Sequence, residues 1–251
     1  MTVEPGWATV ALLAGTSLVA GFIDAIAGGG GLLTLPALLS AGLPPHLALG
    51  TNKGQSVFGS GTALLYFSRT PLLDRRRARQ GAAFALLGAA LGVALVSRAP
   101  ARLLTPVVMA LLVAVALLMA WPRAPRPAQT PRVRPAWLAA AVALCMGAYD
   151  GFFGPGTGTF LIMLYAGVFA DPLDAASANA KVVNFASNLA SVAVFGAAGL
   201  VVWRVALPMA VGQIVGGWLG AHVTLRRGQR LVRVAVIVVS LALVVSLAIR
   251  L

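Results

Sequence analysis

Apolar runs close to 20 residues long recur along the whole chain, separated by short polar stretches. A helix needs about 20 apolar residues to cross the hydrocarbon core of a bilayer, so runs of this length are typical of membrane-spanning helices. Charged residues make up only 10% of the chain, against about 25% in soluble domains. We therefore predict an all-α polytopic membrane protein that lies in a lipid bilayer.

The predicted architecture has two halves of five apolar segments each. The segments cover about 7–26, 31–43, 45–67, 80–97, 102–121, 136–153, 157–170, 174–200, 204–223 and 232–250. A linker rich in proline and arginine, 123–135, separates a first transmembrane repeat, 1–122, from a second, 136–251. Segments 31–43 and 157–170 are too short to span about 30 Å at 1.5 Å per residue. Since each follows a glycine-rich sequence, each is expected to form half of a broken or re-entrant helix.

The two halves resemble each other in sequence. The first contains Asp24 and Lys53, and the second contains Asp150 and Lys181. The two aspartates are 126 positions apart and the two lysines 128, which favours a duplicated motif over chance similarity. Because each half has an odd number of segments, the halves are expected to be inverted repeats, an architecture found in many secondary transporters.

The net charge of +13 comes mainly from arginines in short stretches beside apolar runs. The arginine-rich loops are 69–79, 123–134 and 226–233. Cytoplasmic loops carry such an excess of positive charge, and aromatic residues are not interleaved with these arginines as on a nucleic-acid surface. We therefore expect all three loops in the cytoplasm, both termini outside, and no nucleic-acid partner.

Clusters of glycine interrupt the apolar sequence near the start of each half. Glycine costs about 1 kcal/mol in a helix interior and proline about 3 kcal/mol, so such clusters end helices. A helix that restarts after the break presents its N-terminal N–H groups to the gap. The candidate anion-binding residues are Gly29, Gly30 and Gly31 in the first half, and Gly156, Thr157 and Thr159 in the second. The alternative is that the glycines only allow close helix packing.

The only two lysines of the chain lie inside apolar segments, where a lone ammonium is expensive to hold. Polar residues lie beside each lysine or on the same helix face, at spacings of three and four. The candidate substrate-binding residues of these two groups are Lys53 with Thr51, Asn52 and Ser56, and Lys181 with Asn184 and Asn188. Such a polar stripe is expected to face the bundle interior and to bind a small anion. Alternatively, each lysine snorkels to the membrane interface.

Three further polar residues are candidates for coupling or for a structural role. Asp24 and Asp150 come just before the two breaks, where they could cap a helix, pair with a lysine, or carry a coupling proton. Gln213 is expected to make a helix–helix hydrogen bond, although it could touch a substrate. One cysteine, two separated histidines and no nucleophile or phosphate-loop motif predict no metal site, no cofactor and no enzyme activity.

These motifs resemble the TauE/SafE family of membrane transporters, also called sulfite exporters. In the first half the resemblance lies in GFIDAIAGGGGLLTLPALLSAGLPP from Gly21, with GTNK ending at Lys53. In the second half it lies in GAYDGFFGPGTGTFL from Gly147, with ASANAKVVNFASN ending at Asn188. The resemblance implies two homologous bundles around one path. It also implies export of small sulfur oxyanions or organosulfonates, such as sulfite or sulfoacetate, across a bacterial plasma membrane.

The sequence therefore predicts a secondary transporter that exports a small anion by alternating access. A passive anion channel is the alternative, and it would need an open pore. A membrane enzyme or a scaffold explains the paired intramembrane lysines less well. The anion, the coupling ion, the direction of transport and the oligomeric state, a homo-oligomer included, stay open.

Overall fold

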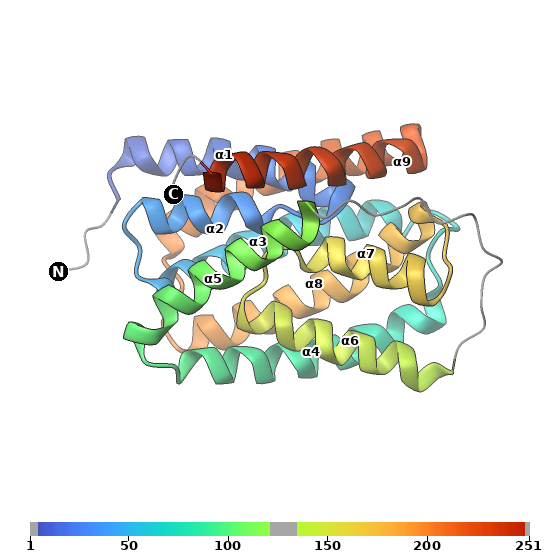
Figure 1. Cartoon of the computed structure of the whole chain (residues 1–251), viewed down its shortest axis with the longest axis horizontal. Coiled ribbons are helices and arrows are strands. Elements are labelled where there is room, and N and C mark those ends of the chain that lie inside the picture. Colours follow the sequence, from blue (N-terminus) through green and yellow to red (C-terminus); the bar gives the residue numbers. More distant parts are fainter. Residues whose placement is uncertain (1–4, 121–134, 249–251) are drawn as a thin grey trace.

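The computed structural model describes residues 5–120 and 135–248 (Figure 1). The regular secondary structure of the described residues is entirely helical, which confirms the predicted all-α class. The helices are α1 (Trp7–Ala27), α2 (Gly31–Ser40), α3 (Pro45–Phe67), α4 (Arg75–Ser97), α5 (Ala101–Ala120), α6 (Ala136–Phe152), α7 (Thr157–Val168), α8 (Leu173–Ala197) and α9 (Trp203–Ala248). The predicted linker, 123–135, lies outside the described residues apart from Pro135, so the two-repeat division stays a prediction.

The two largest errors in the predicted helix bounds concern α4 and α9. Helix α4 begins at Arg75 rather than at residue 80, because the Asp74 carboxylate accepts hydrogen bonds from the N–H groups of Arg76 and Arg77 at 3.1 Å. Part of the predicted loop 69–79 is therefore helical. The last two predicted segments fall in one assigned helix, α9. Arginine is a good helix former and one glycine there costs only about 1 kcal/mol, so nothing in that stretch forces the helix to end.

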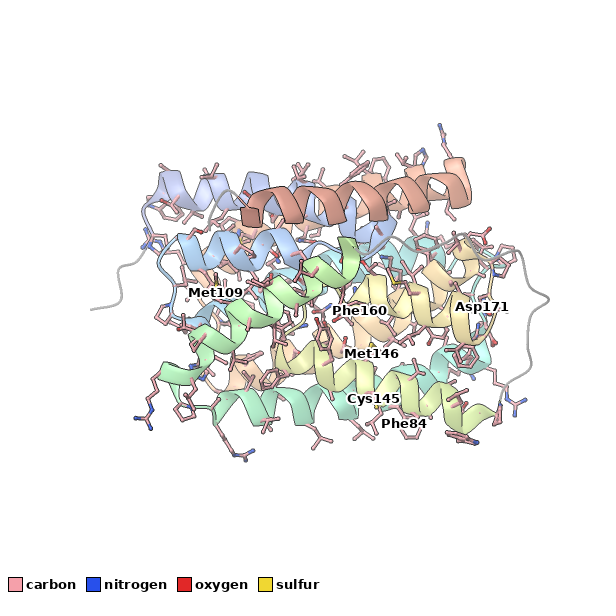
Figure 2. All side chains as sticks on the ribbon, in the orientation of Figure 1. Phe84, Met109, Cys145, Met146, Phe160 and Asp171 are labelled. Atoms are coloured by element: carbon pink, nitrogen blue, oxygen red, sulfur yellow. The ribbon has the colours of Figure 1, made fainter. Side chains whose placement is uncertain are left out.

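The outer surface is suited to lipid. Within the described residues, α1, α4 and α8 are each long and apolar enough to cross a membrane. Large apolar side chains such as Leu12, Leu87 and Leu207 are more than half exposed, at 71%, 60% and 52%. Figure 2 shows side chains projecting from the outside of the bundle, with Cys145 of α6 among them. Exposed apolar surface on this scale indicates contact with a membrane rather than with water.

Long helices from the two halves of the chain pack against each other. Helix α1 lies along α9, α6 lies along α4, and α3 contacts α8 (Figure 1). A Cβ atom at Gly88 of α4 would meet the carbonyl of Leu144, and one at Gly216 of α9 would meet the carbonyl of Leu18. The glycines are 128 positions apart and the leucines 126, the same offsets as the lysines and the aspartates. A duplicated fold would produce such matched contacts, while the opposite orientation of the halves stays a prediction.

The predicted breaks at the glycine-rich motifs are confirmed. Residues 28–30 separate α1 from α2, and residues 153–156 separate α6 from α7. At 1.5 Å per residue the 10 residues of α2 and the 12 residues of α7 span about 15 and 18 Å, roughly half of a bilayer core. Each broken element therefore ends inside the bundle.

Candidate functional site

The two helix breaks meet in the middle of the molecule. The main chains of Gly28 and Gly158 are in contact, so a Cβ atom on either would collide with the other. The hydroxyl of Thr159, in the first turn of α7, donates a hydrogen bond to the carbonyl of Ala27 at 2.6 Å. This bond satisfies a carbonyl at the C-terminal end of α1, which has no partner within its own helix. The first half and the second half thus complete each other's broken ends.

Local sequence explains why the chain can turn at both breaks. Gly28 ends α1 at a φ of 78° and Gly156 precedes α7 at a φ of 84°, a left-handed conformation that glycine adopts without a steric penalty. In the second break the Tyr149 hydroxyl donates to the carbonyl of Pro155 at 2.6 Å. The Thr157 hydroxyl donates to the carbonyl of Gly154 at 2.7 Å. These bonds hold the carbonyls that the interrupted helix leaves without partners.

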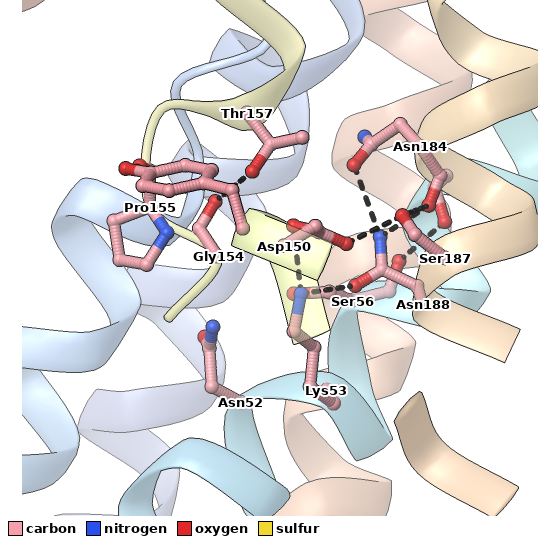
Figure 3. A network of polar contacts seen from close by, with 12 residues as sticks. Asn52, Lys53, Ser56, Asp150, Gly154, Pro155, Thr157, Asn184, Ser187 and Asn188 are labelled. Carbon is pink, nitrogen blue, oxygen red and sulfur yellow. Dashed lines mark hydrogen bonds and ion pairs between the residues drawn. The ribbon is translucent and has the colours of Figure 1, made fainter. Parts of the chain in front are cut away.

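Lys53 of α3 forms an ion pair across the two halves. Its ammonium lies 2.7 Å from Oδ1 of Asp150 on α6, and it donates a hydrogen bond to Oδ1 of Asn188 on α8 at 3.2 Å (Figure 3). The other carboxylate oxygen of Asp150 accepts a hydrogen bond from Ser187 at 2.5 Å. Lys53 and Asp150 are 2% and 1% exposed, so the pair lies in the interior of the protein, away from bulk water and lipid.

Lys181 of α8 also reaches the opposite half, but it meets a different group. Its ammonium donates to the main-chain carbonyl of Asp24, near the C-terminal end of α1. The Asp24 carboxylate accepts hydrogen bonds from the N–H of Gly30 at 3.3 Å and from the Asn184 amide at 3.5 Å. A cation near a helix C-terminus is favourably placed in the helix dipole. Each lysine therefore binds the aspartate residue of the other half, one through the carboxylate and one through the backbone.

A small cavity of about 20 Å³ lies between the two breaks. Its lining residues come from both halves: Asp24, Gly28, Gly31, Asn52, Lys53, Ser56, Asp150, Gly154, Gly158, Asn184 and Asn188. A cavity needs about 10–15 Å³ to hold one water molecule, so this one has room for little more than a single water. A larger ion would fit only after the surrounding helices move apart.

Eight of the predicted site residues line this cavity. They are Asp24, Gly31, Asn52, Lys53, Ser56, Asp150, Asn184 and Asn188. The side-chain oxygen Oδ1 of Asn52 accepts hydrogen bonds from the Thr34 hydroxyl at 2.5 Å and from the Gln55 side-chain amide at 3.0 Å. This arrangement fixes the Asn52 side chain, and its amide nitrogen lies near the break at Gly31 and Pro155.

The other predicted residues lie around the cavity without lining it. These are Gly29, Gly30, Thr51, Gly156, Thr157, Thr159, Lys181 and Gln213. Thr51 is turned toward the start of α9, where its hydroxyl accepts a hydrogen bond from the N–H of Val202 at 3.0 Å. Gln213 is buried between α1 and α3, beside Gly21 and Gly59. In this conformation, Thr51 therefore satisfies a backbone N–H before α9, and Gln213 packs between helices.

Sequence reasoning missed Ser187, which holds Asp150, and Thr34, which holds Asn52. Ser187 could have been found, because it follows Asn184 by three positions and so lies on the polar face of α8. Thr34 gave no such signal, because the short segment around it is apolar and its partner lies on another helix.

Comparison with known proteins identifies the family of the chain. The sequence matches the family described as "Sulfite exporter TauE/SafE" over residues 13–247. No solved structure matches the chain.

Three curated relatives are similar along most of their length. The "Probable membrane transporter protein ORF9" of Sinorhizobium sp. is 37% identical over 239 residues, covering 95% of this chain and 92% of the relative. A "Probable membrane transporter protein" of Haemophilus influenzae is 39% identical over 232 residues, covering 92% and 91%. The "Probable membrane transporter protein YfcA" of Escherichia coli K12 is 36% identical over 225 residues, covering 89% and 84%.

These relatives are named as transporters and not as enzymes, in agreement with the prediction from the sequence. The match covers both helix breaks, both lysines and both aspartates. The chain is a membrane transporter, and it belongs to the TauE/SafE family.

Proposed function

We propose that this transporter exports a small anion, sulfite or an organosulfonate such as sulfoacetate, across a bacterial plasma membrane by alternating access. The observation that carries the proposal is the buried ammonium of Lys53 in a polar cavity lined by both halves of the chain. A charged group in the interior of a membrane protein marks a substrate or ion pathway by default. The family description and the names of the relatives support transport and leave the anion to experiment.

The groups around the cavity suit a small oxyanion that must also be released. The Lys53 ammonium is a compact point charge without the fixed fork of arginine, so it binds an oxyanion without demanding one geometry. Amide donors of Asn52 and the N–H groups at the start of α7 would complete the shell of the anion. Lys181, which does not line the cavity, instead holds the end of α1 and so shapes the break.

The size of the cavity and its lining by both halves of the chain support alternating access. Because there is room for little more than a water, the helices of the two halves must separate to admit an anion. Rocking of one bundle against the other around a fixed site is the usual mechanism for transporters with broken helices. A passive channel would instead need a continuous pore past Lys53.

Transport by purified protein in liposomes tests the proposal. Sulfite, sulfoacetate, taurine, sulfate and acetate should be compared as substrates, and we expect saturable flux of one sulfur oxyanion that is stimulated by substrate on the far side. Lys53→Gln should abolish that flux, whereas Arg98→Gln, which removes a cation at the exposed end of α4, should preserve it. Flux that rises linearly with concentration, without stimulation from the far side, would instead establish a channel.

A further inference from the structure

The ammonium of Lys53 is already occupied by a group of the protein itself. Asp150 presents one carboxylate oxygen to Lys53 at 2.7 Å, and Ser187 donates a hydrogen bond to the other at 2.5 Å. An ammonium and a hydroxyl donor are also the kinds of partner that a sulfite or sulfonate ion binds. All three side chains are almost completely buried. The carboxylate of Asp150 is thus bound as an anionic ligand would be.

Charge counting leads to the same point. Two lysines and two aspartates are the charged residues brought together around the breaks, and with all four ionised their charges cancel. A neutral cluster of this kind has no spare positive charge for a substrate. An entering anion that pairs with Lys53 therefore competes with the Asp150 carboxylate for the same positive charge.

The two carboxylates differ in how they are held. Asp24 also lines the cavity, but its carboxylate bonds to the N–H of Gly30 and to Asn184 rather than to a lysine. Asp150 is the carboxylate whose bond to an ammonium the anion would have to replace. This difference makes Asp24 a matched control for Asp150, with the same charge in the same cavity.

Resting on the function proposed above, we propose that the Asp150 carboxylate competes with the transported anion for Lys53. Asp150 occupies Lys53 when the cavity is empty, and the anion binds by taking Lys53 from it. The competition lowers the apparent affinity for the anion, because Lys53 is free in only a fraction of the molecules. It also keeps Lys53 paired while the empty transporter returns, so the return step does not leave a buried cation without a partner.

A binding experiment on purified full-length protein separates this role from a purely structural ion pair. Sulfoacetate binding is measured by titration calorimetry for wild type, Asp150→Asn, Asp24→Asn and Lys53→Gln. Competition predicts that Asp150→Asn binds sulfoacetate about tenfold more tightly than wild type and that Asp24→Asn changes the affinity much less. An Asp150→Asn affinity equal to or below that of wild type, with Lys53→Gln inactive in binding, would overturn the competition and leave the proposed function intact. Undiminished binding by Lys53→Gln would remove Lys53 from the anion site, and with it the observation that carries the proposed function.

Transport supplies a second readout that a structural role would not move. In liposomes, Asp150→Asn should show a lower ratio of net sulfoacetate efflux to sulfoacetate–sulfoacetate exchange, since only net efflux requires the empty transporter to return. An unchanged ratio in a variant that still transports would contradict the proposal. If Asp150→Asn does not fold, Ser187→Ala decides the question, because it keeps the carboxylate and removes the hydroxyl that holds it. Ser187→Ala should bind sulfoacetate more tightly than wild type, and unchanged or weaker binding would refute competition.

Discussion

Gly28 and Gly158 lie main chain against main chain, so the helix break of the first half touches the helix break of the second with no room for a side chain. The contact joins the C-terminal end of α1 to the first turn of α7. It brings together the parts of the chain that line the cavity, and it makes glycine a requirement at both positions.

Gly28→Ala should destabilise the protein strongly. The new methyl group would collide with the Gly158 backbone, which costs about 1–3 kcal/mol in a packed interior, and the positive φ adds about 1–2 kcal/mol. Gly42→Ala is the matched control, because Gly42 has a φ of 88° and open space around its Cα. Thermal unfolding in detergent should show a much larger loss for Gly28→Ala. Equal losses would mean that backbone strain, and not the contact, makes glycine necessary.

Lys53 and Asp150 should show strong energetic coupling. Removal of one partner leaves the other charge buried and unpaired, so Lys53→Gln should lower stability by about 3–5 kcal/mol. The double variant Lys53→Gln/Asp150→Asn, which carries a neutral pair of similar shape, should recover a large part of that loss. A double-mutant cycle on the free energy of unfolding measures the coupling. Additive effects of the two substitutions would show that the ion pair does not hold the halves together.

The two lysines should differ in function. Lys181 does not line the cavity and contacts the backbone carbonyl of Asp24, so Lys181→Met should mainly reduce stability. Lys53→Gln should abolish anion binding at temperatures where the folded state persists. Sulfoacetate titrations at low temperature, alongside thermal unfolding of both variants, separate the two effects. Complete loss of sulfoacetate binding in a stably folded Lys181→Met variant would show that Lys181 is also needed to bind the anion.

Arg77 ties the start of α4 to the connection between α7 and α8. Its guanidinium lies 2.5 Å from the Asp171 carboxylate and 5.1 Å from the ring centres of Tyr165 and Phe169. Arg77→Ala should lower the unfolding free energy by about 1–2 kcal/mol, since it removes a charge-assisted bond and two cation–π contacts. Arg76→Ala removes an equal charge from an exposed position and should have little effect. Similar losses of unfolding free energy in Arg77→Ala and Arg76→Ala would mean that Arg77 acts only through its net charge.

If the two halves are inverted, the connection before α4 and the connection between α8 and α9 should lie on opposite sides of the membrane. In a Cys145→Ala background, Pro71→Cys before α4 should react with a membrane-impermeant maleimide only from the cytoplasm. Ala198→Cys, between α8 and α9, should react only from the outside. Labelling of intact bacterial cells and of inside-out vesicles measures both. Reaction of both cysteines from the same side would exclude the predicted topology.

Much of the helix pattern was predictable from local sequence. The bounds of α3 were predicted to the residue, because Pro44 and Pro45 favour a helix start there and an apolar run follows. The helix breaks were predictable because glycine and proline act on the chain where they stand. The start of α4 was predicted too late, because the Asp74 cap extends the helix into a charged stretch that hydropathy alone reads as a loop.

The sequence by itself determined that the chain is a bundle of apolar helices, with two interrupted ones and a lysine after each interruption. These properties depend on hydrophobicity and backbone preference, which act over a few residues. Only the tertiary structure decided that Lys53 is neutralised by Asp150, that Lys181 meets a backbone carbonyl, and that Thr51 and Gln213 lie outside the cavity lining. Partners such as Lys53 and Asn188 are 135 positions apart, and their meeting depends on how the two halves pack.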